Sequence, residues 1–367
     1  MSRCLDVVVL GGGPAGCSTA IELARLGQAV AVLSLARGGG SGGARIGDSL
    51  SPQARPLLHR LGLWAAFEAD GHLPCHANRS AWGTDELQHL DFIRHPQGHG
   101  FHVDRERFDH RLQARAQALG VGFVALAVPP ALTRQAGQWQ LSAPGWQGQA
   151  SWLVDATGRS SWLARRQGAS RLEIDRQVAV VAWLRAGTTM DDGSSLIEAV
   201  ADGWWYSAPL PGGLWSTAFF TDADLHPLPG LRTEAGWRAL LRRAPHTHAR
   251  LQQAQWQAAA TCVPAGSACL HSAVGPGWLA VGDAAIRYDP LSAHGLTVAL
   301  ASGLHAAQAL GRLQAGDGSA LPAYDRLLRQ AFDEHALQRQ QLYCQEMRFA
   351  RHPYWARRQQ TAFARAA

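Results

Sequence analysis

The pattern of apolar positions along the chain predicts alternating strands and helices. An apolar run at 7–10 is typical of a buried strand, and a second run at 30–33 follows a stretch with one apolar helical face. Residues 177–187 and 213–222 alternate or run apolar with β-branched and aromatic side chains, which predicts strands of another sheet. From residue 320 onward apolar positions recur every three or four residues, which predicts a helical tail. We therefore expect an α/β fold.

A glycine-rich turn joins the first strand to the first helix. It reads Gly11-x-Gly13-Pro14-Ala15-Gly16. In such a turn the first glycine permits tight bending, the second lets backbone N–H groups approach a pyrophosphate, and the third lets helix and strand pack closely. The N-terminus of the helix adds partial positive charge toward the phosphates. Because a second strand follows, the segment predicts a Rossmann-like dinucleotide-binding unit.

The end of the second strand departs from the usual dinucleotide pattern. An acidic residue is expected there to bind the ribose hydroxyls, and this chain has Ser34. A serine can still form a hydrogen bond to the ribose, but without charge we expect a contact weaker by about 1 kcal/mol. Whether the nucleotide stays bound is left open by this substitution.

A second glycine-containing segment near the C-terminal end predicts the other half of a cofactor site. Residues 278–281 form a short apolar run that leads into Gly282-Asp283, and a helix is expected from Gly295 to about Leu310. The Asp283 carboxylate can accept hydrogen bonds from a sugar alcohol, and the helix N-terminus would stabilise negative charge on a reduced flavin. These features favour FAD. The candidate contacts here are Gly282, Asp283, Pro290, Gly295 and Leu296.

These motifs and two further ones resemble FAD monooxygenases of the p-hydroxybenzoate hydroxylase fold, over nearly the whole chain. The matching stretches are 11–16, 105–109, 155–161 and 282–295. The resemblance implies that Asp283 holds the ribityl chain and that an arginine near Arg107 lies close to the flavin. Arg165 falls one residue later than the family's usual arginine. The remaining candidate FAD-binding residues are Arg45, Ser49, Arg107 and Gly158.

Three other stretches resemble the halogenase-like branch of that family. Residues 47–50 read Gly-Asp-Ser-Leu and are similar to the branch's Gly-Glu-Ser/Thr-Leu segment beside the isoalloxazine ring. Residues 203–209 and 348–358 are most similar to the flavoprotein hydroxylases that mature tryptophylquinone enzymes. The resemblance therefore implies a hydroxylase that acts on a protein tryptophan.

Together, the pattern and the resemblance predict a Rossmann-like FAD-binding domain interleaved with a second, mainly antiparallel sheet domain. Residues 1–75, 104–172 and 268–318 are assigned to the FAD-binding domain, residues 76–103 and 173–267 to the substrate domain, and residues 319–367 to a C-terminal helical segment.

The reaction implied by the resemblance is oxygen transfer from a flavin C4a-hydroperoxide to an electron-rich aromatic ring. Halogenases of the branch carry hypohalous acid through a lysine, whereas all 34 basic residues of this chain are arginine, which stays protonated. The halogenase motif Trp-x-Trp-x-Ile-Pro corresponds here to Trp204-x-Tyr206-x-Ala208-Pro209. We predict hydroxylation of indole in tryptophan or in a tryptophan-containing peptide, and disfavour halogenation. The electrons would come from NAD(P)H or a separate flavin reductase.

Three side chains are candidates for a role in this chemistry. Trp204 and Tyr206 could stack on the substrate ring, as could neighbouring Trp205 and Trp215, although core packing of a strand is the alternative for each. His294 is a candidate proton relay, and a histidine bonded to backbone at a helix start is the alternative. Two other functions stay open: a flavin-dependent reductase or dehydrogenase of a small apolar molecule, and a protein that holds FAD within a maturation complex without catalysis.

Composition and charge restrict the remaining classes. The formal charge is +6, but the basic residues do not form a stretch interleaved with aromatic residues. No nucleic acid is therefore expected as a partner. The six cysteines show no CxxC spacing and no pairing with histidine, so neither a metal site nor a disulfide framework is expected. No apolar run is long enough to span a bilayer, and the first residues do not resemble a signal peptide, so a cytoplasmic enzyme without membrane association is expected.

Overall fold

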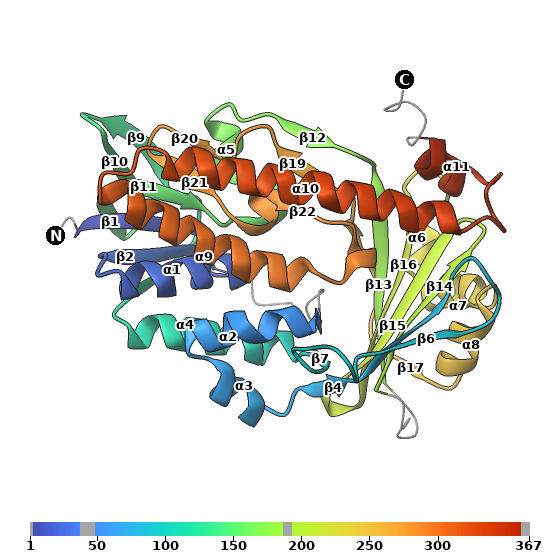
Figure 1. Cartoon of the computed structure of the whole chain (residues 1–367). Coiled ribbons are helices and arrows are strands. Elements are labelled where there is room, and N and C mark those ends of the chain that lie inside the picture. Colours follow the sequence, from blue (N-terminus) through green and yellow to red (C-terminus); the bar gives the residue numbers. More distant parts are fainter. Residues whose placement is uncertain (1–2, 37–47, 186–192, 361–367) are drawn as a thin grey trace.

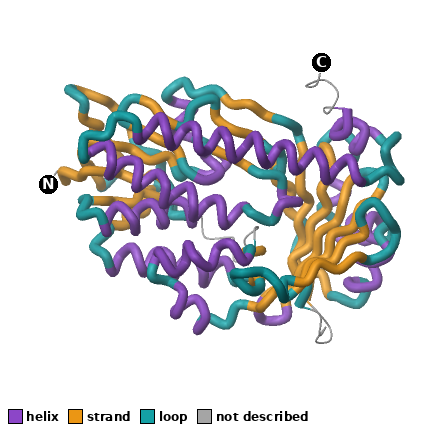
Figure 2. The backbone as a smooth tube through the Cα atoms, viewed as in Figure 1, coloured by secondary structure: helices purple, strands orange, loops and turns teal. Residues whose placement is uncertain are grey.

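The structure is a computed structural model that describes residues 3–36, 48–185 and 193–360. Two large sheets lie at opposite ends of the molecule, and a long C-terminal helix passes along both (Figure 1). The tube view shows helices mainly around the first sheet and the strands of the second sheet gathered beside them (Figure 2). The α/β fold with two interleaved sheets and a C-terminal helical segment is confirmed.

The first sheet has a parallel centre. Its parallel strands, in spatial order, are β21 (Trp278–Ala280), β11 (Trp146–Asp155), β1 (Arg3–Leu10), β2 (Val30–Leu35) and β8 (Gly122–Leu126). Antiparallel additions are β20 (Val274–Gly275), which pairs with β21, and the hairpin of β9 (Ala131–Gln135) and β10 (Gln138–Ala143), which pairs with β11. The apolar run in β1 is uninterrupted because this central strand is buried on both faces.

Helices cover the parallel strands with their apolar sides. They are α1 (Pro14–Arg25), α2 (Arg55–Leu61), α3 (Trp64–Ala69), α4 (Arg105–Ala118), α5 (Trp162–Arg166) and α9 (Gly295–Gln314). Helix α1 contacts both α4 and α9. A Cβ atom on Gly303 of α9 would stand 2.5 Å from the carbonyl oxygen of Ala15, so this glycine permits the close approach of α1 and α9. The two segments that carry the candidate cofactor motifs are therefore packed against each other.

The second sheet is antiparallel except at one pair. Its strands, in spatial order, are β17 (Gln255–Trp256), β13 (Gln177–Arg185), β16 (Leu214–Asp222), β15 (Gly203–Leu210), β14 (Ser195–Val200), β5 (Ala77–Ala81) and β6 (Gln88–Asp91), and β18 (Thr261–Pro264) also pairs with β13. Strands β14 and β5 run parallel. One face packs against α7 (Glu234–Leu241) and α8 (Pro245–Leu251), which follow the one-turn helix α6 (Leu228–Leu231). The other face is turned toward the first half of the molecule and the C-terminal helices.

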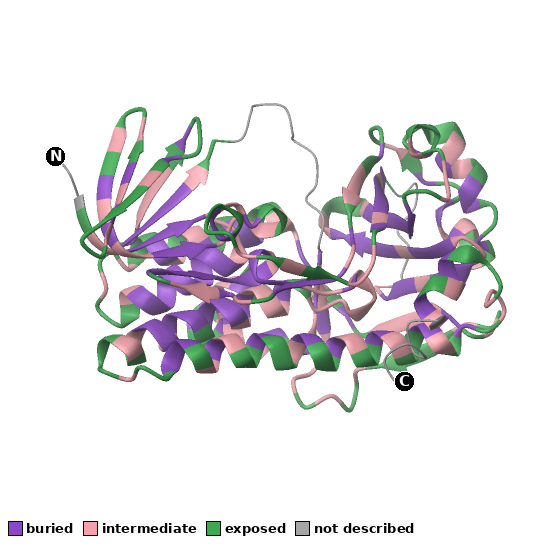
Figure 3. Ribbon diagram, turned by 90° about the horizontal axis from the view of Figure 1, so that it is seen from above, coloured by how far each residue is buried: buried purple, intermediate pink, exposed green. Residues whose placement is uncertain are grey.

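Short sheets and the helical tail join the two halves. One short sheet has β3 (Ser49–Leu50), β7 (Gly100–His102) and β4 (Leu73–Cys75), and the other has β12 (Arg171–Glu173), β19 (Ala268–Leu270) and β22 (Ile286–Arg287). Within 76–103, strands β5 and β6 therefore join the second sheet, whereas β7 does not. The tail is α10 (Ala320–Gln345) followed by α11 (Pro353–Gln360), and the burial view shows α10 with one buried and one exposed side (Figure 3). The domain boundaries given above stay a prediction.

Candidate active site

Three loops meet at the carboxyl-terminal edge of the parallel strands. The glycine turn follows β1, the loop around Gly158 follows β11, and Gly282-Asp283 follows β21. Because these strands are parallel, their carboxyl ends lie at one edge of the sheet, which is where ligands of open α/β sheets bind. The loops touch: a Cβ on Gly11 would stand 2.2 Å from the carbonyl oxygen of Ala156.

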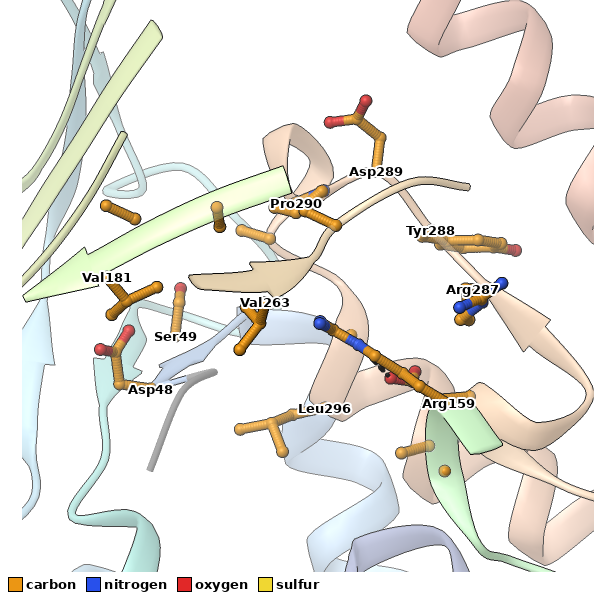
Figure 4. A pocket seen from close by; sticks show the side chains of 18 of the residues that line it. Asp48, Ser49, Arg159, Val181, Val263, Arg287, Tyr288, Asp289, Pro290 and Leu296 are labelled. Atoms are coloured by element: carbon orange, nitrogen blue, oxygen red, sulfur yellow. Dashed lines mark hydrogen bonds and ion pairs between the residues drawn. The ribbon is translucent and has the colours of Figure 1, made fainter. Parts of the chain in front are cut away.

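These loops border one cavity of about 410 Å³ that extends to the second sheet (Figure 4). Near the parallel strands it is lined by Gly13, Pro14, Ala15, Gly158, Arg159, Val281, Asp283, Arg287, Pro290, Gly295, Leu296 and Ala299. Near the second sheet it is lined by Asp48, Ser49, Ala179, Val181, Trp204, Tyr206, Ser216, Ala218 and Phe220. One space therefore joins the candidate cofactor loops to the candidate substrate residues.

The glycine turn has the geometry that a pyrophosphate requires. Gly11 has φ +113° and Gly16 would place a Cβ 2.0 Å from the carbonyl oxygen of Gly11, so both glycines serve the turn itself. Gly13 is different: a Cβ built there meets nothing within 4 Å, and the residue lines the cavity at the start of α1. The open backbone at Gly13 and the N-terminus of α1 can together hold the phosphates of a dinucleotide.

Asp283 contributes a carboxylate to the lining of this cavity. It lies in the short 3-10 helix Gly282–Ala284 that follows β21, and its side chain is 39% exposed. The guanidinium of Arg159 lies across from it, with Nε 3.4 Å from Oδ2. Gly282 has φ +55° and would place a Cβ 2.7 Å from that of Ala15, so this segment can stand beside the glycine turn only without a side chain there. The arrangement fits a carboxylate that binds sugar-alcohol hydroxyls.

The start of α9 closes the same side of the cavity. Pro290 opens a 3-10 turn, and the Asp289 carboxylate accepts a hydrogen bond from the backbone N–H of Leu291 at 2.9 Å. Gly295 and Leu296 then begin α9 at the cavity wall. The helix N-terminus is therefore directed at the site, as a cofactor with a developing negative charge requires.

A buried polar network holds this turn from behind. Asp289 is 1% exposed, and its Oδ2 lies 2.7 Å from Nε of Arg339 and 3.1 Å from the hydroxyl of Tyr343. Arg339 also pairs with Asp175. The indole N–H of Trp204 donates to the same Tyr343 hydroxyl at 3.1 Å. The network thus connects the cofactor turn, helix α10 and the aromatic wall of the second sheet.

That aromatic wall is built by alternation along β15 and β16. Trp204 stacks on Phe220 with ring centroids 3.9 Å apart and planes 16° apart, and Tyr206 lies two residues further along the same face. The remaining wall residues from the sheet are small: Ala179, Val181, Ser216, Ala218 and Val263. Small side chains facing large rings leave a flat apolar space, which suits a planar aromatic molecule.

The structure brings most of the predicted cofactor residues together. Gly13, Pro14, Ala15, Ser49, Gly158, Asp283, Pro290, Gly295 and Leu296 line the cavity, and Gly11, Gly16 and Gly282 shape its turns. Ser34 lies at the end of β2, next to the turn, because Gly11 N–H donates to the carbonyl of Leu33 at 2.7 Å. Arg45 lies outside the described residues.

Arg107 and Trp205 lie outside the lining of this cavity, and the role of His294 stays a prediction. Arg107 is not among the residues that line this cavity, because its guanidinium donates to the Asp70 carbonyl; Arg105, at the start of α4, lines the cavity instead. Trp205 does not border the cavity either, since adjacent strand residues point to opposite faces, and it packs against Trp237 beneath the sheet. His294 takes the N-cap position of α9, and burial lowers the pKa of its imidazole.

Several cavity residues were missed from the sequence. Phe220 could have been found from its place opposite Trp204 in neighbouring strands, and Arg159 from its place in the matching stretch 155–161, whereas Arg287 carries no local signal. Asp155, by contrast, is fully buried, and its two carboxylate oxygens accept hydrogen bonds from Thr157 and from the backbone N–H of Ala164. That aspartate fixes the loop and does not face the cavity.

Ser34 offers a direct test of the nucleotide end. We expect Ser34→Glu to tighten FAD binding about fivefold, because a carboxylate at the end of β2 would add roughly 1 kcal/mol of charge-assisted hydrogen bonding to the ribose. Equilibrium dialysis of apoprotein against FAD measures the change. Unchanged or weaker binding would count against the ribose position assigned to the end of β2.

His335 makes the cofactor turn sensitive to acid. Its Nε2 accepts the backbone N–H of Asp289 at 3.0 Å, and its ring stacks on Tyr288 at 3.9 Å. Burial lowers its pKa to about 4, so the neutral ring stabilises the fold fully above the unfolded value of about 6.5, and this stability is lost as the pH falls toward 4. From pH 7 to pH 5, the contribution should fall by about 2 kcal/mol.

Urea unfolding at both pH values, with wild type and His335→Gln, isolates this contribution from that of the other histidines. The variant should lose about 2 kcal/mol less than wild type over the same interval, since glutamine does not titrate. Equal losses in the two proteins would show that His335 does not carry the effect.

Among residues 3–36, 48–185 and 193–360, no three His, Cys, Asp or Glu side chains are grouped so that they could hold a metal ion. In the same part of the chain, no helix has both the length and the apolar character needed to cross a membrane.

Comparison with known proteins places this geometry among flavin enzymes. The sequence pattern of the family described as "FAD binding domain" matches residues 4–340. LodB of Marinomonas mediterranea, which is named as an FAD-dependent oxidoreductase, is 29% identical over 374 residues, covering 96% of both chains. The tryptophan 2-halogenase of Chondromyces crocatus is 28% identical, over 90% of this chain and 66% of the relative. Among solved structures, the peptidyl tryptophan dihydroxylase QhpG, essential for tryptophylquinone cofactor biogenesis, is 29% identical with a TM-score of 0.79, over 97% of this chain and 78% of that one.

Proposed function

Because this chain belongs to the FAD binding domain family, as an FAD-dependent oxidoreductase of its halogenase-like branch, we propose that it hydroxylates the indole ring of a tryptophan held in a peptide or protein. The observation that carries the proposal is the single cavity shared by the cofactor loops and the flat aromatic wall of the second sheet. The 29% identity to a peptidyl tryptophan dihydroxylase supports the same substrate class.

The residues of this chain bind and orient, and they exclude water. The backbone at Gly13 and the N-terminus of α1 would hold the pyrophosphate, and Asp283 would hold the ribityl hydroxyls. When bound and reduced in the presence of O₂, FAD supplies an electrophilic oxygen atom for transfer to an electron-rich ring. Trp204 and Tyr206 would hold that ring in place, and the small apolar residues beside them would limit the access of water to it.

Hydroxylation is favoured over halogenation by a feature of the whole sequence. Halogenases of this branch depend on a lysine, and no lysine occurs among the 367 residues. The arginines at the cavity, Arg105, Arg159 and Arg287, cannot replace it as nucleophilic amines because a guanidinium stays protonated. Relatives of both kinds match with nearly equal identity, so the test must separate oxygen from halogen.

The first experiment separates an oxygenase from a reductase and from a protein that only holds FAD. Holoenzyme is supplied with chemically reduced FAD, so that neither NAD(P)H nor a partner reductase is needed, together with free tryptophan or tryptophan-containing peptides encoded by neighbouring genes. We expect substrate-dependent oxygen consumption and a product heavier by about 16 mass units per inserted oxygen. Flavin reoxidation without any mass gain on the whole panel would contradict the proposed function.

A further inference from the structure

Trp204 belongs to the cavity wall, but almost all of its surface is buried. The residue is 1% exposed, its ring stacks on Phe220, and it meets Trp82 with ring centroids 6.3 Å apart and planes at 71°. A ring packed in this way shows little of its own surface to the cavity. Its position is therefore set by the groups on its buried side, and these include the hydroxyl of Tyr343.

The hydroxyl of Tyr343 joins two elements from different halves of the molecule. It accepts the indole N–H of Trp204, in β15, at 3.1 Å. It donates to Oδ2 of Asp289, at the turn in front of α9, at 3.1 Å. A hydroxyl has one proton to donate, and a carboxylate is a stronger acceptor than the amide oxygen of Gln177, which lies 3.2 Å away. One oxygen atom of α10 thus links the aromatic wall to the cofactor turn.

Tyr343 is itself held firmly. It is fully buried, and the guanidinium of Arg339 lies 4.7 Å from its ring centroid. Burial raises the pKa of its phenol, so the group stays neutral and keeps the proton that it donates. The close-up shows the Asp289 carboxylate directed away from Arg159 and Leu296 (Figure 4). Because it lies behind the residues that line the cavity, Tyr343 can affect a ligand there only through its neighbours.

The next residue of β15 provides a comparison. The indole N–H of Trp205, on the opposite face of the strand, is buried without a hydrogen-bond partner among the described residues. Packing alone can therefore hold a tryptophan in this strand. The hydrogen bond of Trp204 is an additional restraint, and it occurs on the face that is turned to the cavity.

We propose that Tyr343 is a positioning residue, whose hydroxyl holds Trp204 and the Asp289 turn in one fixed arrangement, so that an aromatic ring bound at the wall lies within reach of the cofactor. This inference rests on the proposed function for its substrate class. Loss of the hydroxyl leaves the single proton of the Trp204 indole nitrogen without its acceptor, which loosens the wall without changing the residues that line it.

A double-mutant cycle on ligand binding tests the proposal without turnover. 3-Methylindole represents the tryptophan side chain, and its dissociation constant is measured by calorimetry with oxidised holoenzyme. Tyr343→Phe keeps the buried ring and removes only the hydroxyl, so it should weaken binding about fivefold through a less ordered wall. In a Trp204→Phe background, which has no indole N–H at this position, the same substitution should change the dissociation constant by less than about 1.5-fold.

Tyr324→Phe is the matched control, because it removes another buried hydroxyl from α10. That hydroxyl donates to the carbonyl oxygen of Ala280 at 2.8 Å. Both single variants should lose a similar amount of stability in urea, but Tyr324→Phe should bind 3-methylindole as wild type does. Flavin absorbance shows that each protein carries FAD. Unchanged binding in Tyr343→Phe, additive effects of Tyr343→Phe and Trp204→Phe, or equal weakening in Tyr324→Phe would each overturn the assignment.

The outcomes also separate this inference from the proposed function. If the cycle is additive but oxygen is inserted into a tryptophan peptide, the role of Tyr343 is wrong and the hydroxylase stands. If the two substitutions interact as expected but no oxygen is inserted, the positioning residue stands and the reaction is wrong. If wild type does not bind 3-methylindole, the substrate class and the role of Tyr343 fail together.

Discussion

Replacing Asp283 with alanine is expected to give a folded protein that no longer retains FAD. The carboxylate lines the cavity together with the glycine turn and the start of α9, where we propose that the sugar alcohol of the cofactor binds. Hydrogen bonds to a charged group contribute about 1.5–3 kcal/mol each, so losing them should weaken FAD binding by on the order of a hundredfold or more.

The fold itself should not depend on this residue. Asp283 and its partner Arg159 are 39% and 38% exposed, and an ion pair of that kind contributes little to stability. Flavin absorbance after gel filtration, together with the thermal unfolding of the apoprotein, measures both effects. Asp317→Ala is the matched control, because Asp317 pairs with Arg312 at the surface, away from the cavity. A variant at position 283 that stays as yellow as wild type would remove Asp283 from the cofactor site.

Replacing Arg339 with glutamine is expected to destabilise the protein by about 3–5 kcal/mol, since it would leave buried carboxylates without their cation. Arg339 is 4% exposed and joins Asp289 at 2.7 Å to Asp175, which is 12% exposed. Asp289 begins the turn in front of α9, so the loss should also loosen the cofactor loop.

Urea unfolding of the apoproteins measures the change in the free energy of unfolding. Arg243→Gln is the comparison, because Arg243 is 64% exposed in its pair with Asp202 and should change stability by no more than about 0.5 kcal/mol. A loss of less than about 1 kcal/mol in Arg339→Gln would show that the buried network contributes specificity without stability.

The parts of the fold that could be predicted are those with a local cause. The strand–turn–helix at the start of the chain follows from an apolar run and three glycines. At two of these, Gly11 and Gly16, a Cβ atom would overlap backbone atoms, so a larger residue does not fit. The segment after β21 was predictable for the same reason, since Gly282 needs its positive φ. The face of β15 was predictable too: strand alternation alone puts Trp204 and Tyr206 together and Trp205 opposite.

Contacts between distant residues had no such signal. The network joins Asp289 to Arg339 and Tyr343, which lie 50 and 54 positions further along, and no spacing rule relates residues so far apart. The sequence also does not indicate which of the two arginines, Arg105 or Arg107, lines the cavity. It depends on how α4 begins, with the Asp104 side chain accepting the N–H of Arg107, so that Arg105 is turned to the cavity.

The central claim is oxygen transfer to an aromatic ring in the cavity between the flavin loops and the second sheet. The most direct measurement is a single-turnover reaction of the holoenzyme with reduced FAD, ¹⁸O₂, bromide and a tryptophan-containing peptide, followed by mass spectrometry of the peptide. We predict that the tryptophan gains ¹⁸O from O₂ and no bromine. A product with the isotope pattern of bromine, or a hydroxylated product whose oxygen comes from water, would contradict the account.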